Sequence, residues 1–83
     1  MVFEVQVLEE VTTGINWKPA GPDVNVSGDD PGQAAVAEVA KFTGWYRARP
    51  KAAPDSQWAF YNVTAHPRTG QPVVEFSEDP PPP

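Results

Sequence analysis

The chain has 83 residues, of which 40% are hydrophobic and none is cysteine. This length accommodates one small domain, and the lack of cysteine excludes disulfides, thiolate nucleophiles and thiolate metal sites. The formal net charge is -5, yet five of the six basic residues lie between Lys41 and Arg68, so a basic region is embedded in an acidic protein.

The composition also indicates where the protein acts. No apolar segment approaches the ~20 residues of a membrane span, and the N-terminus begins with a strand-like alternation instead of a signal sequence. We therefore expect a cytoplasmic protein with no membrane partner. The abundance of alanine, valine, proline, glycine and aspartate, with a single isoleucine, is typical of a GC-rich genome such as that of an actinobacterium or its phage.

The first part of the chain predicts strands. Between residues 2 and 11 most odd positions are apolar, which is the alternation of a half-buried strand, with a break at Leu8 and Glu9. Residues 12–14 predict a turn, and residues 15–17 predict a short second strand. The prolines of residues 18–22 then argue against ladder pairing, so residues 23–26 are expected to form only a short extended segment.

The segment Asp29-Asp30-Pro31 is the strongest local signal in the sequence. Aspartate accepts hydrogen bonds from the free N–H groups at a helix start, and proline suits the first turn. A helix over residues 33–43 should follow, ended by Gly44 because glycine enters the left-handed conformation easily. Four apolar residues share its predicted buried stripe: Ala35, Val36, Val39 and Phe42.

Three more strands are predicted after the helix. Residues 45–49 alternate and stop at Pro50, and residues 57–65 form the best candidate for a central strand because both faces carry apolar side chains. A hairpin connection at residues 66–71 leads to a last strand at residues 72–76.

The order of these elements predicts an α+β fold, namely an antiparallel sheet of four to five strands with one short helix packed on one face. We expect residues 1–77 to form this single domain and residues 78–83 to be a disordered acidic, proline-rich tail.

The sequence lacks a convincing catalytic constellation. Its one histidine, His66, precedes a proline in a predicted turn, and the adjacent acids Glu9 and Glu10 would point to opposite faces of a strand. No phosphate-binding or dinucleotide-binding motif is present. We therefore expect neither an enzyme nor a protein that holds a metal or cofactor.

The segment Trp45-Tyr-Arg-Ala-Arg-Pro-Lys51 is the sharpest candidate for function. On a strand, Trp45, Arg47 and Arg49 share one face, where guanidinium groups beside an indole can hold a carboxylate, a phosphate or a flat base. The predicted binding residues are Trp45, Arg47, Arg49, Lys51, Trp58 and Tyr61.

A structural interpretation of the same residues is equally open. The two arginines could pair across the sheet with acidic residues, the candidates being Glu4, Glu10 and Glu75. The aromatic residues Trp58, Phe60 and Tyr61 could likewise belong to the core.

These observations favour a small non-catalytic protein-interaction module, for example an accessory, inhibitory or phage-encoded protein. It would bind a protein partner through an exposed sheet face or edge, with homodimer formation left open. One alternative is a small nucleic-acid-binding domain that uses Trp45, Arg47, Arg49 and Lys51, although the net charge of -5 opposes it. Another alternative is a structural subunit of a larger assembly.

Overall fold

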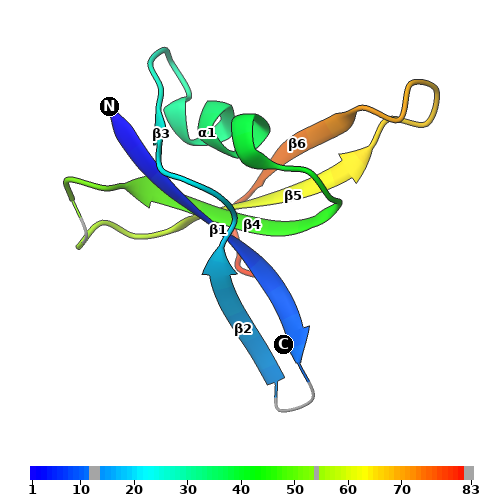
Figure 1. Cartoon of the computed structure of the whole chain (residues 1–83), viewed down its shortest axis with the longest axis horizontal. Helices are drawn as coiled ribbons and strands as arrows, with labels where there is room; N and C mark the ends of the chain where they lie inside the picture. The colour runs from blue at the N-terminus through cyan, green and yellow to red at the C-terminus, as the bar shows by residue number, and fades with distance from the viewer. Residues whose placement is uncertain (12–13, 54, 82–83) are drawn as a thin grey trace.

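The strands join one antiparallel sheet, and a short helix packs on one of its faces (Figure 1). The computed structural model describes residues 1–11, 14–53 and 55–81, except for the side chains of residues 10 and 11. The elements are β1 (Val2–Val11), β2 (Gly14–Pro19), β3 (Val24–Asn25), α1 (Pro31–Val39), β4 (Gly44–Pro50), β5 (Ala59–Ala65) and β6 (Pro72–Ser77). The predicted α+β class is confirmed, with five strands in the main order and the short β3 as a sixth.

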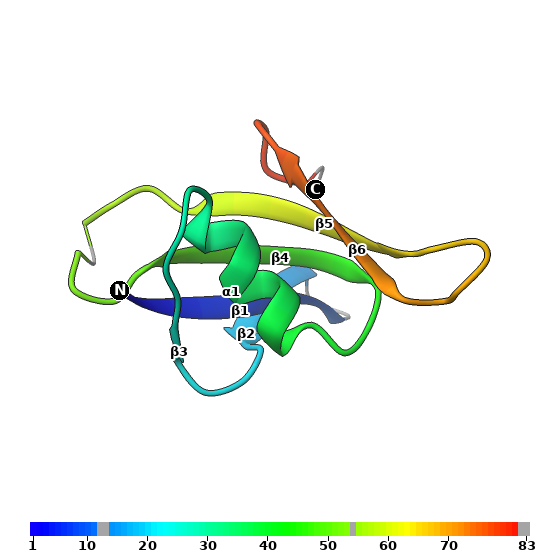
Figure 2. The same cartoon turned by 90° about the horizontal axis from the view of Figure 1, so that it is seen from above.

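The sheet has the order β2-β1-β4-β5-β6, and β3 also pairs with β1. Figure 2 shows α1 lying across this sheet, with β6 along one margin and β2 and β3 near the other. Each neighbouring pair is antiparallel, as between Val5 of β1 and Ala48 of β4. The centre of the sheet is β4, so the segment that carries the two arginines is flanked by strands on both sides.

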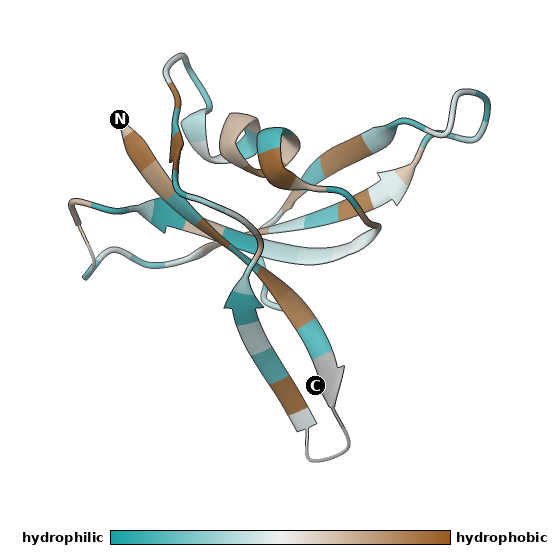
Figure 3. Ribbon diagram, viewed as in Figure 1, coloured by the Kyte–Doolittle hydropathy of each residue, from teal (hydrophilic) through white to brown (hydrophobic). Residues whose placement is uncertain are grey.

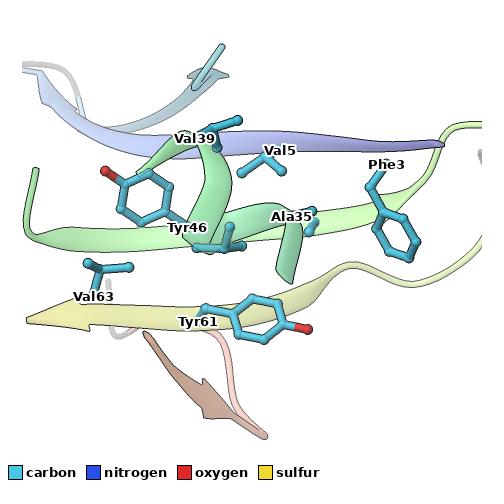
Figure 4. Close-up of a cluster of buried hydrophobic side chains, with 9 residues drawn as sticks. Phe3, Val5, Ala35, Val39, Tyr46, Tyr61 and Val63 are labelled. Atoms are coloured by element: carbon cyan, nitrogen blue, oxygen red, sulfur yellow. The ribbon is translucent and has the colours of Figure 1, made fainter. Parts of the chain in front are cut away.

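The hydrophobic core lies between α1 and the sheet face that α1 covers (Figure 4). Because side chains alternate between faces along a strand, β1, β4 and β5 each supply alternate residues to this core. The colour along β1 and β2 in Figure 3 changes between hydrophobic and hydrophilic in the same way. The buried residues are Phe3, Val5, Ala35, Val36, Val39, Tyr46, Ala48, Tyr61 and Val63.

The helix has a predicted aspartate as its N-cap, but it begins at Pro31 and ends earlier than the predicted residue 43. Asp30 is its N-cap, and the Asp30 carboxylate accepts a hydrogen bond from the backbone N–H of Gln33 at 3.2 Å. The helix ends at Val39, and Ala40 is already extended, with φ of -69° and ψ of 120°. The prediction of a helix through residue 43 was therefore wrong.

Packing of Tyr46 explains the early end of the helix. The Tyr46 hydroxyl is placed beside the connection to β4, where it donates a hydrogen bond to the carbonyl of Phe42 at 2.7 Å. Phe42 itself is 77% exposed and does not belong to the buried stripe. Gly44 has a positive φ of 141°, but it begins β4 and does not end the helix.

The strands also differ in detail from the prediction. β1 pairs without interruption through Leu8 and Glu9. β2 continues to Pro19, which is paired with Gln6, because an edge strand tolerates the missing N–H of proline on its outer side. β5 begins at Ala59, so Trp58 lies directly before it.

The C-terminal tail is described as far as residue 81. Within it, the Ser77 hydroxyl donates to the carbonyl of Asp79 at 2.8 Å, and the chain bends there. Residues 82–83 lie outside the described residues, as do residues 12–13 of the predicted first turn.

The helix found in the described part of the chain lacks the length and the apolar composition that a membrane span requires.

Candidate functional site: an aromatic and arginine face

The sheet face opposite α1, here called the open face, carries the predicted binding segment. Alternation along β4 places Tyr46 and Ala48 in the core and Trp45, Arg47 and Arg49 on the open face. The strand register then aligns Arg47 with Gln6 of β1 and with Phe60 of β5, and it aligns Arg49 with Glu4. The open face is therefore built from β1, β4 and β5, with β2 beside them.

Two indole rings and two guanidinium groups lie close together on the open face. The guanidinium carbon of Arg47 is 4.5 Å from the ring centroid of Trp17 and 4.1 Å from that of Trp58. Arg49 lies 4.0 Å from the same ring of Trp58. Each contact of this kind contributes about 0.5–1 kcal/mol at exposed sites and about 2 kcal/mol when water is excluded. We call these four residues the Trp-Arg cluster.

The cluster depends on curvature of the sheet. Trp17 lies on β2 and Phe60 on β5, with β1 and β4 between them. In a flat sheet with strands about 4.8 Å apart, these backbones would be about 14 Å apart. The two ring centroids are nevertheless 6.0 Å apart, which indicates that the sheet curls toward the open face. Figure 1 shows the hairpin of β1 and β2 bending away from the side of the helix.

Glu4 organises the positive charges at one end of the open face. Its carboxylate accepts a hydrogen bond from Nε of Arg49 at 2.5 Å and lies 3.7 Å from Nζ of Lys51. Lys51 also pairs with Asp23 at 3.4 Å. The Glu4 side chain is only 21% exposed, so these charges interact partly out of water. The structural interpretation therefore applies to Arg49, which pairs with Glu4.

Arg47 has a different environment from Arg49. Its Nε donates a hydrogen bond to the neutral amide oxygen of Gln6 at 2.7 Å. Among the described side chains, which do not include that of Glu10, no carboxylate lies within 4 Å of the Arg47 guanidinium. Burial, with a smaller contribution from the charge of Arg49, lowers the pKa of Arg47, while Glu4 acts in the opposite direction. Arg47 is thus a partly desolvated cation held by an amide and two indoles.

Five of the six predicted binding residues lie on or beside the open face. Trp45, Arg47 and Arg49 lie on β4, Lys51 follows β4, and Trp58 directly precedes β5.

Tyr61, the sixth predicted residue, lies on the other face and is 3% exposed. Its ring packs edge-on against Phe76 with centroids 5.8 Å apart. Burial, and to a smaller extent the charge of Asp30, raises the pKa of Tyr61. Tyr61 is therefore a core residue and not part of the open face, because β5 turns it toward α1.

Sequence reasoning missed Trp17 and Gln6 as members of the site. A strand around Trp17 is predictable from the local pattern, but its position over Arg47 depends on the register between β2 and β1. Gln6 occurs in a polar position of the first strand like several other residues, and nothing in the sequence identifies it as the partner of Arg47. Both residues can be assigned to the site only from the structure of the folded sheet.

Two shallow hollows lie on the helix side, near the end of α1. They have volumes of about 310 and 410 Å³ and share Ala20, Val39 and Lys41 in their walls. Buried Tyr46 lines the smaller hollow, but its hydroxyl already donates to the Phe42 carbonyl. Among the described residues, neither hollow is lined by a buried charged side chain of the kind that anchors a small molecule.

The histidine and the acidic side chains do not form a second candidate site. The His66 ring accepts hydrogen bonds from the backbone N–H groups of Arg68 and Thr69 at 3.1 and 3.3 Å, as expected for a turn residue. Among the described residues, no group of three or more histidine, aspartate or glutamate side chains could hold a metal ion.

The chain matches no protein-family model, and comparisons with curated proteins and with solved structures gave no match either.

Proposed function

We propose that this protein is a small, non-catalytic protein-interaction module that binds a protein partner through the open face. The observation that carries the proposal is the contact of Arg47 with both Trp17 and Trp58 on the side of the sheet opposite α1. Tryptophan and arginine are enriched among the residues that dominate binding energy in protein interfaces. We place this interaction in the cytoplasm, as the sequence composition suggests.

The cluster is also held in place before any partner binds. The hydrogen bonds from Arg47 to Gln6 and from Arg49 to Glu4 restrict two long side chains that would otherwise be flexible. Ordering a long side chain on binding costs about 0.5–1.5 kcal/mol. A face whose arginines are already ordered avoids much of this cost, which favours a role in recognition.

Nucleic-acid binding is the second candidate, because an indole beside a guanidinium can stack on a base. Two features disfavour it. The net charge of -5 repels a polyanion, and two of the basic residues near the open face, Arg49 and Lys51, already interact with Glu4. A role as a subunit of a larger assembly, or contact with a second copy, would use the same face and differs only in the identity of the partner.

The test is affinity capture from a lysate of the native host, with and without nuclease, using the wild-type chain and two open-face variants. Trp58→Ala and Arg47→Glu should each reduce the captured partner at least about tenfold, as expected for central interface residues. Phe42→Ala and Arg68→Glu are matched controls in exposed positions away from the cluster and should leave capture unchanged.

Thermal unfolding of each variant separates loss of binding from loss of folding. A partner that survives nuclease and is lost with the two open-face variants supports the proposal. Capture that disappears with nuclease indicates a nucleic-acid binder, and capture that no open-face variant affects contradicts the proposal.

A further inference from the structure

The three cations near the open face differ in whether a described carboxylate lies within ion-pair distance. Three cations, Arg47, Arg49 and Lys51, lie near two carboxylates, those of Glu4 and Asp23. Both carboxylates interact with Arg49 or Lys51, whereas the polar partner of Arg47 is the neutral amide of Gln6. One positive charge at the centre of the cluster therefore has no opposite charge within ion-pair distance in the described part of the chain.

In this environment Arg47 would be stabilised by a nearby negative charge. Two indole rings shield part of its guanidinium group from water, and a second cation, Arg49, contacts the same ring of Trp58. Coulomb attraction is stronger where water is excluded, so an incoming anion gains more here than at an exposed lysine. The lowered pKa of Arg47 has the same physical origin, namely burial and the neighbouring arginine.

The contacts also define how an anion would approach. The guanidinium carbon of Arg47 lies over the rings of both Trp17 and Trp58, and Nε donates to Gln6. The terminal N–H groups of the guanidinium are the donors that an incoming planar carboxylate would use, and arginine binds this group best through two parallel hydrogen bonds.

We propose that the protein partner presents an acidic peptide segment to the open face and places one carboxylate against Arg47. This inference rests on the proposed function and specifies the chemistry of the partner. A single carboxylate matches Arg47, the one of these three cations with no described carboxylate within ion-pair distance. A nucleic-acid backbone would bring a row of phosphates to a protein that is negatively charged overall.

The experiment uses the full-length chain labelled with nitrogen-15 and follows the side-chain N–H signals of Arg47, Trp17 and Trp58 by NMR. The probe is the blocked peptide acetyl-Ala-Glu-Pro-Asp-Ala-amide, and its control is the same peptide with glutamine and asparagine in place of the acids. The acidic peptide should shift all three signals to saturation. The neutral peptide should bind at least about tenfold more weakly, because it lacks the charge-assisted hydrogen bonds.

Arg47→Gln should weaken binding of the acidic peptide by at least about tenfold, and the matched variant Arg68→Gln, in the turn between β5 and β6, should not. Equal binding of the two peptides, unchanged binding by Arg47→Gln, or the absence of any shift overturns the inference. Tighter binding of an oligothymidine than of the acidic peptide also overturns it. The peptide comparison on the wild-type chain needs no variant to fold.

The effect of two variants on affinity capture of the partner distinguishes this inference from the proposed function. If Trp58→Ala abolishes capture while Arg47→Gln leaves it intact, the open face is the binding site but the partner does not use a carboxylate there, which overturns the inference alone. If neither variant affects capture, both the inference and the proposed function fail.

Discussion

The core leaves no space for a side chain at Gly32. It lies in the first turn of α1 and is buried, with the Tyr61 ring beside it. A Cβ atom at this position would collide with the Tyr61 hydroxyl and lie 3.3 Å from its Cζ. The absence of a side chain therefore allows α1 to approach β5 closely.

We predict that Gly32→Ala lowers the free energy of unfolding by about 1–3 kcal/mol, the usual cost of overpacking, although alanine favours helices over glycine. Adding Tyr61→Phe should recover part of this loss, because it removes the colliding hydroxyl. Gly21→Ala is the control, since its Cβ would meet Val39 at an ordinary 3.7 Å. Urea denaturation gives the free energy of unfolding of the wild type, of the two single variants and of the double variant. A Gly32→Ala variant as stable as wild type would contradict the collision.

Tyr61 also makes stability depend on pH at the alkaline end. Its folded pKa is raised above the ordinary value of 10.0 by burial and by Asp30. The unfolded chain therefore loses this proton first, so the contribution of Tyr61 is fully present below about pH 10 and is lost as pH rises through the folded pKa. Denaturation at pH values from about 8 to 11 should show a shallower alkaline decline for Tyr61→Phe than for wild type. Parallel declines would show that Tyr61 is not the group responsible.

At the scale of elements, the start of α1 depends on one carboxylate. Asp30 caps the helix through the N–H of Gln33, whereas the adjacent Asp29 is exposed and is not the N-cap residue. We predict that Asp30→Ala lowers the free energy of unfolding by about 1 kcal/mol and that Asp29→Ala changes it much less. Chemical denaturation at neutral pH distinguishes the two. Equal losses would mean that the general acidity of the segment matters and that the cap does not.

The strands and the helix differ in how far local patterns define them. Alternation predicted β1, β4, β5 and β6 to within about two residues, because a strand with one buried face carries its periodicity in the sequence. The end of α1 could not be predicted in this way. Phe42 continues the apolar stripe at helical spacing, and the chain leaves the helix because Tyr46 enters the core of the sheet and donates to the Phe42 carbonyl.

At the scale of the whole molecule, the Trp-Arg cluster connects the hairpin of β1 and β2 to the centre of the sheet. Trp17 is the member that reaches from β2 to Arg47. We predict that a double-mutant cycle of Trp17→Ala and Arg47→Ala in chemical denaturation gives a coupling free energy of about 1 kcal/mol. The cycle of Trp17→Ala with Arg68→Ala should be additive, because Arg68 lies in the turn between β5 and β6. Additivity in the first cycle would contradict the contact.

The same cluster determines what the open face can recognise. Its arginines lie on β4, but one indole comes from β2 and the other directly precedes β5. A partner therefore meets groups from three parts of the chain, held by the curvature of one sheet. If the hairpin were displaced, Arg47 would lose the Trp17 ring and with it part of its shielding from water.

The sequence by itself determined the fold class, the cap of the helix and the face shared by Trp45, Arg47 and Arg49, because capping and alternation are local properties of the chain. Only the tertiary structure decided that Tyr61 belongs to the core, that Glu4 takes Arg49 as its partner and that Trp17 joins Arg47. These outcomes depend on strand register and sheet curvature, which result from packing between segments far apart in the sequence.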